Sequence, residues 1–224
     1  MTSVLTAVAA LYDAFQSRPP LEVEGCPCCS DPEELQALVN TPRDALTAAQ
    51  LEFYASSALL TVGGVDDLRH YWPRLVELSL TGELQTDPEI VFAKPRHGEW
   101  RNWPAAEQEA LVALAHAQVD ALAQGGDAID DFAVETWVCA FGQFLADVTV
   151  VLSPLLRPEP GPMAALRKWY ALNEDDLARD MLWDTFWEFA PGNAARVCAW
   201  FAEPSVRDAV NRALTSTLSG GEYR

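Results

Sequence analysis

VDDLRHYWPRLVELSL, residues 65–80, is the segment from which the fold class of this chain follows. The apolar side chains of this segment recur at spacings of three and four residues, which places them on one face of an α-helix that begins at Asp66 or Asp67. They are Leu68, Tyr71, Trp72, Leu75, Val76 and Leu78. Pro73 falls early enough to kink the first turns without ending the segment. An amphipathic helix ending at Leu80 is therefore predicted.

The same helical spacing continues on both sides of this segment. It predicts helices at 2–16, shortly after Ser30, at 47–62, 103–124, 128–153, 163–172, 174–189, 192–202 and 204–218. Ser30 with Glu33, and Thr47 with Gln50, are the capping signals of the second and third of these helices. Residues 82–102 interrupt it with two prolines and two glycines, so a long loop with one short extended segment is expected there. The predicted fold is all-α, an irregular bundle or stacked helical hairpins, with eight to nine of these ten segments expected as separate helices.

Composition and charge narrow the class of protein. Half of the 224 residues are hydrophobic and eight are Trp, which predicts one folded domain spanning 1–224, with a subdomain boundary only at the proline-rich segment 157–162. The net charge of −18 disfavours nucleic acid and favours a basic protein as partner. We find neither a signal peptide nor an apolar run long enough for a membrane span, so the predicted location is cytoplasmic.

Cys26-Pro27-Cys28-Cys29 is the most distinctive tetrapeptide of the chain. Thiolates bind soft metals, but a structural zinc site takes four Cys or His ligands, paired with two to four residues between the members of each pair. Here one residue separates Cys26 from Cys28, and Cys28 and Cys29 are adjacent. We therefore interpret Cys26, Cys28 and Cys29 as structural thiols, with metal binding as a weaker alternative and redox chemistry as the weakest.

Two acidic clusters are candidate sites. Asp127, Asp130 and Asp131 superficially resemble the magnesium-binding aspartates of helical isoprenoid synthases, although capping of a helix N-terminus explains them more simply. On the predicted helix 174–189, carboxylates at successive i, i+4 positions would form a row on one face that suits a basic partner, and a solvated face is the simpler interpretation. The residues of this row are Asp176, Asp180, Asp184 and Glu188.

The predicted loop contains the one basic cluster, residues 94–101. Its partner-binding candidates are Arg96, His97 and Trp100, because loops often carry function. A basic loop on so acidic a protein more often pairs with its own surface, and we favour that interpretation.

Three segments carry a family resemblance: residues 25–28, residues 51–75, and Trp100-Arg101-Asn102-Trp103-Pro104 with Glu107. Together they resemble a family of uncharacterised bacterial helical proteins over roughly the first half of the chain. The resemblance implies a bacterial source and a shared fold, and it supplies neither an activity nor a cofactor nor a site residue.

The motifs of common enzyme classes are absent: there is no G-x-S-x-G, no P-loop and no dinucleotide fingerprint. The leading prediction is a non-enzymatic acidic binding protein, immunity-like or adaptor-like, that engages a basic protein and needs no cofactor. The alternative is a helical enzyme dependent on a divalent metal bound by clustered aspartates. Magnesium belongs to that alternative, and zinc to a thiol site at the cysteines.

Overall fold

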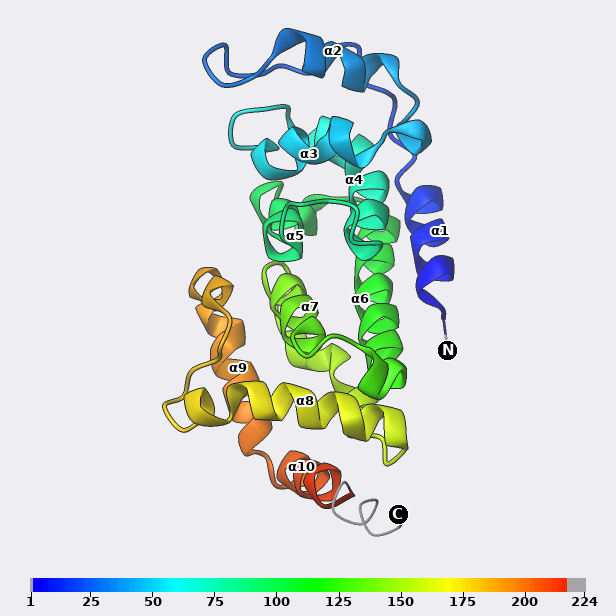
Figure 1. Cartoon of the computed structure of the whole chain (residues 1–224). Coiled ribbons are helices and arrows are strands. Elements are labelled where there is room, and N and C mark those ends of the chain that lie inside the picture. Colours follow the sequence, from blue (N-terminus) through cyan, green and yellow to red (C-terminus); the bar gives the residue numbers. More distant parts are fainter. Residues whose placement is uncertain (1, 217–224) are drawn as a thin grey trace. The chain divides into compact units, whose positions relative to one another are not determined.

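The computed structural model describes residues 2–216 and is all-α (Figure 1). This part of the chain contains ten α-helices and six short 3-10 helices, and its extended contacts are the isolated bridges Gly25–Val62 and Ala58–Val62. None of these helices combines the length and the apolar character needed to cross a membrane. The predicted fold class is confirmed, and the number of helices is one or two above the prediction.

The chain divides into two compact units, an N-terminal unit of residues 4–114 and a C-terminal unit from Ala115 onward. The division falls within helix α6 (Ala105–Gly125). The proline-rich segment 157–162 lies inside the C-terminal unit. Each unit is described by itself below.

Helix α4 (Val65–Leu80) is the centre of the N-terminal unit. It packs against α1 (Val4–Ala14), α3 (Ala48–Ser57), α5 (Pro88–His97) and the 3-10 helix η1 (Arg43–Ala45). Its predicted apolar face is buried, and Trp72 meets Phe92 of α5 edge-to-face with 5.6 Å between ring centroids. The unit also contains α2 (Pro32–Asn40) and η2 (Trp100–Asn102).

Local capping signals were partly predictive in this unit. Thr47 and Gln50 form the expected capping box at the start of α3. Helix α2 is instead capped by Asp31, which accepts a hydrogen bond from the backbone N–H of Glu33, because the Ser30 hydroxyl donates to the carbonyl of Cys26. Helix α3 also ends at Ser57, before the predicted Val62.

The predicted long loop at 82–102 is wrong, since α5 occupies its middle. Pro88 stands in the first turn of the helix, where its missing N–H costs nothing. The apolar residues Val91 and Phe92, expected in an extended segment, are fully buried on one side of α5. Burial of this face outweighs the local breaking tendency of Pro95.

The C-terminal unit is built around α8 (Pro160–Leu177). This helix packs against α10 (Pro204–Ser216) and α7 (Ala133–Gly142), and α9 (Pro191–Ala202) packs against α10. Four 3-10 helices complete the unit: η3 (Gly126–Ala128), η4 (Val148–Val151), η5 (Ser153–Leu156) and η6 (Thr185–Phe189).

The predicted helix at 128–153 is wrong in length, because α7 ends at Gly142. The side chain of Asn193 on α9 causes this end by replacing helical hydrogen bonds. Its amide nitrogen donates to the carbonyls of Gly142 and Leu145, both at 2.8 Å, and its oxygen accepts from the backbone N–H of Val148 at 3.0 Å. The chain then continues as 3-10 turns.

The predicted helix at 174–189 is also wrong, because the buried carboxylate of Glu135 organises this segment differently. Glu135 accepts hydrogen bonds from the indole of Trp169, from Asn173 at 3.0 Å and from the indole of Trp187 at 2.7 Å. Asn173 in turn accepts from the backbone N–H of Trp183 at 2.8 Å. These contacts fold the chain back after Leu177, and η6 replaces the expected helical turns.

Replacement of Glu135 is expected to destabilise the C-terminal unit. Glu135→Gln puts an amide donor where a carboxylate oxygen now accepts an indole N–H, which should lower the free energy of unfolding by about 2 kcal/mol. Chemical denaturation measures the change. Glu174→Gln, at an exposed position of α8, is the control and should stay within about 0.5 kcal/mol of the wild type. Equal stability of the two variants would contradict the role of Glu135.

Candidate functional site

The cysteine loop, residues 25–30, is fastened to the chain between α3 and α4. Gly25 and Val62 form an antiparallel bridge. The N–H of Cys26 donates to the carbonyl of Thr61 at 2.8 Å, and the N–H of Gly63 donates to the carbonyl of Glu24 at 2.7 Å. Because these bonds join backbone to backbone, they fix the start of the loop regardless of side-chain chemistry.

Inside the loop the backbone closes into a tight turn. The N–H groups of Cys29 and Ser30 donate to the carbonyl of Cys26 at 3.1 and 3.0 Å, and the Ser30 hydroxyl donates to the same oxygen at 2.6 Å. A side chain at Gly25 would place its Cβ only 2.4 Å from the Ser30 oxygen and 2.7 Å from Leu35. Glycine is therefore needed at this position for the turn to pack.

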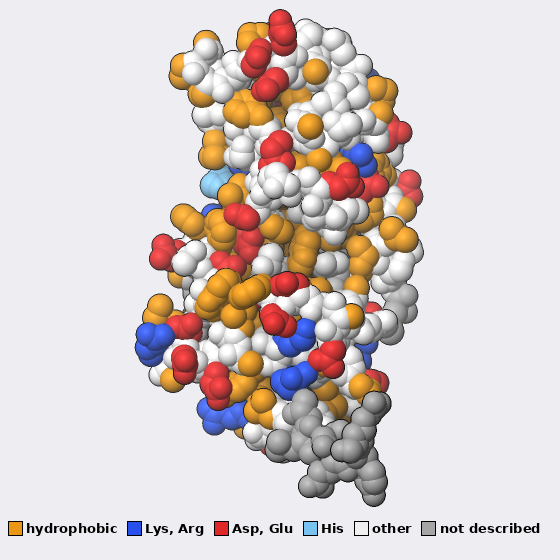
Figure 2. All heavy atoms as spheres, viewed as in Figure 1, with side chains coloured by type: hydrophobic (Ala, Val, Ile, Leu, Met, Phe, Trp, Pro, Cys, Tyr) orange, Lys and Arg blue, Asp and Glu red, His pale blue; other side chains and the backbone are white. Residues whose placement is uncertain are grey.

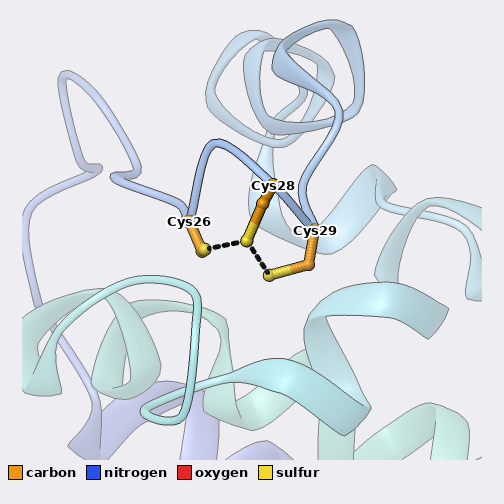
Figure 3. Close-up of side chains that lie close together, drawn as sticks. All are labelled: Cys26, Cys28 and Cys29. Atoms are coloured by element: carbon orange, nitrogen blue, oxygen red, sulfur yellow. Dashed lines mark hydrogen bonds between the residues drawn. The ribbon is translucent and has the colours of Figure 1, made fainter.

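The turn brings three sulfur atoms together (Figure 3). The Sγ atoms of Cys26 and Cys28 are 2.9 Å apart, and those of Cys28 and Cys29 are 3.7 Å apart. All three lie within 4.8 Å of one another. The sequence spacing of the cysteines differs from that of paired zinc ligands, which made metal binding the weaker prediction. The three thiols nevertheless converge in the structure.

The turn also shifts the pKa values of Cys26 and Cys29 in opposite directions. The Cys28 thiol and the backbone N–H groups of Cys28 and Cys29 donate to the sulfur of Cys26, which lowers the pKa of Cys26 to about 7. Hydrogen bonds to Cys26 and Cys28 hold the proton on Cys29 and raise its pKa to about 11. The pKa of Cys26 therefore lies below that of Cys29, and Cys26 becomes a thiolate more readily than Cys29 does.

An open hollow of about 840 Å³ lies beside the cysteine loop, with Cys26 in its lining. Its carboxylates are those of Glu22 and Glu24, before the loop, and of Asp66 and Asp67, in the first turn of α4. Among residues 2–216, no Lys, Arg or His lines it. We call this feature the acidic hollow.

The charge around the cysteine loop extends the acidic character of the hollow. Residues 19–42 contain five acidic residues and not one basic residue. Asp31, Glu33 and Glu34 at the start of α2 are all exposed. Figure 2 shows acidic side chains gathered over α2 on the face in view. The loop thus stands in a negative potential that attracts cations.

The predicted row of carboxylates on one helix face does not exist. Asp176 lies in the last turn of α8 and pairs with Arg179 at 2.5 Å. Asp180 lies in a turn with φ of 55°, and Asp184 is 9% exposed and caps η6 by accepting from the N–H of Phe186. Glu188 is exposed within η6. The contacts of Glu135 described above disperse the four residues.

Asp127, Asp130 and Asp131 are used within the C-terminal unit. Asp127 pairs with Arg167 at 2.7 Å and Asp131 with Lys168 at 3.0 Å. Asp130 accepts from the N–H of Phe132. Among the described residues, these three carboxylates are not brought together as a ligand set. Figure 2 shows basic and acidic side chains side by side over α8.

The basic cluster 94–101 lies at the end of α5 and in η2. Lys94 is 2% exposed and donates to the carbonyl of Ser56 at 2.5 Å, and Trp100 is 8% exposed. Arg96 and His97 are exposed. The structure therefore divides this cluster between the interior and the surface.

The carboxylates of the acidic hollow were missed by reasoning from the sequence. Glu22 and Glu24 belong to no helix, and the sequence marks Asp66 and Asp67 as the start of one. The available signal was the absence of basic residues between Arg18 and Arg43. Their proximity to α4 depends on the bridge between Gly25 and Val62, which no local pattern indicates.

Comparison of the chain with protein-family models, with curated proteins and with solved structures finds no match. Its function must therefore be argued from the cysteine loop and the acidic hollow.

Burial of Lys94 predicts a specific dependence of stability on pH. Desolvation lowers the pKa of Lys94 from 10.5 to about 8. Between these values the unfolded chain binds a proton that the folded chain lacks, so this residue makes the free energy of unfolding rise with pH. The free energies of unfolding of the wild type and of Lys94→Met are measured by denaturation between pH 7 and 10.5. Above pH 8 the free energy of the wild type should rise relative to that of the variant. A difference in the free energy of unfolding that does not change with pH would contradict a lowered pKa of Lys94.

Proposed function

We propose that this chain is a non-enzymatic binding protein whose acidic hollow receives a basic segment of another protein. The observation that carries the proposal is the lining of the hollow, which, in the described part of the chain, holds four carboxylates and no basic residue. Such a site attracts Lys and Arg side chains and repels phosphate backbones. The proposal keeps the predicted class of partner and assigns it to the acidic hollow in place of the row that begins at Asp176.

The carboxylates of the hollow are available to a partner. Glu22 and Glu24 are exposed, and neither forms an ion pair with another residue of 2–216. Asp66 pairs with Arg69 at 3.1 Å, but its side chain is 92% exposed and can accept further hydrogen bonds. Charges left in water at such positions act mainly on the rate and specificity of association.

The hollow also offers apolar surface. Leu60 is 63% exposed and Val65 is 39% exposed, and both line it. The long stems of Arg and Lys pack on apolar side chains while their charged ends reach carboxylates. A basic protein segment therefore fits this combination better than an inorganic cation would. An immunity-like or adaptor-like role in the bacterial cytoplasm is the form of the proposal that matches such a partner.

The alternative proposal, an enzyme that uses a divalent metal at clustered aspartates, has less support. Asp127 and Asp131 are engaged by Arg167 and Lys168, which neutralise the charge that would hold magnesium. The Asp176 row has lost its common face. Both clusters of that alternative are thus less suited to a metal than the sequence suggested.

Affinity capture with matched variants tests the proposed function. The wild type should recover a basic protein from the source cells at low salt and release it at about 1 M salt, where the screening length falls to about 3 Å. Glu22→Gln/Glu24→Gln/Asp66→Asn should lose most of this protein, because the hollow then carries three fewer charges. The amount recovered is measured by quantitative mass spectrometry.

The control removes the same number of charges from the C-terminal unit. Asp175→Asn/Glu203→Gln/Asp208→Asn changes three exposed acidic residues and should recover the partner as the wild type does. Equal loss in both triple variants would mean that net charge alone holds the protein. Recovery that is insensitive to salt and to the hollow variant would overturn the proposal.

A further inference from the structure

The three sulfurs of the cysteine loop form a ligand set. From their convergence we propose that Cys26, Cys28 and Cys29 bind one thiophilic metal ion, of the Zn(II) or Cu(I) kind, as three thiolates whose thiol protons pass to solvent when the ion binds. The proposal goes beyond the binding of a basic protein, because it concerns different side chains and a different ligand. It holds whether or not such a partner exists.

The distances between the sulfurs fit a single ion. With metal–sulfur bonds of about 2.3 Å and tetrahedral angles, two thiolate ligands of zinc lie about 3.8 Å apart. Cys28 and Cys29 already have their Sγ atoms 3.7 Å apart, and all three sulfurs lie within 4.8 Å of one another. Cys26 and Cys28, at 2.9 Å, need to separate by less than about 1 Å to reach this spacing. Side-chain rotation can supply this movement.

The backbone holds this arrangement without help from a metal. The bridge between Gly25 and Val62 fixes the entry to the loop, and the bonds to the carbonyl of Cys26 close the turn. A ligand set that is already ordered loses little conformational freedom when the ion binds. Binding by the folded protein is therefore expected, in contrast to peptides that fold only around their metal.

The ligand chemistry selects the class of ion. Thiolates favour soft ions such as Cu(I) and Zn(II), whereas magnesium and calcium require oxygen ligands. Within residues 2–216, no His, Asp or Glu joins the three thiols in the cluster. Zinc would thus need one ligand from solvent or from another molecule to become four-coordinate. Three thiolates complete the coordination of Cu(I). We therefore expect zinc, but not Cu(I), to recruit a fourth ligand.

The surroundings admit a cation from solvent. Cys28 and Cys29 are exposed and Cys26 is half-buried. The acidic hollow and the carboxylates of α2 raise the local concentration of positive ions. They also disfavour anionic thiol reagents at the same position. The solvent exposure of the thiols and the negative charge around them therefore both favour binding of a metal ion.

Metal titration of the reduced full-length protein tests the proposal. Zn(II) and Cu(I) are added separately, each in competition with a chromophoric chelator, and bound metal is counted against protein. The wild type should bind one equivalent of at least one ion. Cys28→Ser and Cys29→Ser should each weaken binding by more than about 100-fold, the upper end of what loss of an outer-shell partner costs. Both positions are exposed, so circular dichroism should show the fold unchanged.

The control variant is Cys198→Ser, which removes a half-buried thiol of the C-terminal unit and should bind metal as the wild type does. Failure of the reduced wild type to bind either ion would overturn the proposal, as would equal binding by the loop variants. The Glu22→Gln/Glu24→Gln/Asp66→Asn variant should keep its one equivalent of metal. Loss of partner capture with intact metal binding, or the reverse, separates this proposal from the proposed function.

Discussion

The antiparallel bridge between Gly25 and Val62 is the contact on which the candidate site depends. Its neighbouring hydrogen bonds, from Cys26 to Thr61 and from Gly63 to Glu24, join a segment without regular structure to the entrance of α4. Because α4 is the buried centre of the N-terminal unit, the bridge transfers the rigidity of that helix to the cysteine loop. Without it, neither the turn of the thiols nor the hollow beside them would have a fixed geometry.

The bridge also explains why thiols and carboxylates lie together. Glu24 and Cys26 stand on either side of Gly25 in the bridge. On the other side of the bridge, Gly63 lies just before the acidic first turn of α4. Asp67 accepts from the N–H of Gly64 at 2.7 Å, which satisfies the helix end and leaves Asp66 directed to solvent. At Cys26, hydrogen bonds from the Cys28 thiol and from the amide N–H groups of the turn favour the thiolate and lower its pKa.

Prediction from the sequence succeeded where structure is decided locally. The apolar face of α4 and the Thr47–Gln50 capping box were predicted correctly, because neighbouring residues alone determine them. It failed where a distant side chain intervenes. Asn193 ends α7 from another helix, and Glu135 draws Trp187 inward and breaks the expected helix after Leu177. Buried polar contacts of this kind leave no periodic signal in the sequence.

The candidate site shows the same division. The cysteines were identified from their rarity, but the spacing rule taken from paired zinc ligands argued against their convergence. That rule does not describe a closed turn in which Gly25 packs against Ser30. The acidic hollow could not be predicted at all, since its two halves come from segments about 40 residues apart that only the bridge joins.

Amide hydrogen exchange of the metal-free protein tests most directly whether the cysteine loop is held by its backbone. The amides of Cys26 and Gly63, which donate across the bridge, should exchange at least about 100-fold more slowly than in an unstructured peptide. Exchange of these two amides at the rate of an unstructured peptide, in protein whose α4 amides remain protected, would contradict a loop that is ordered before any ligand arrives.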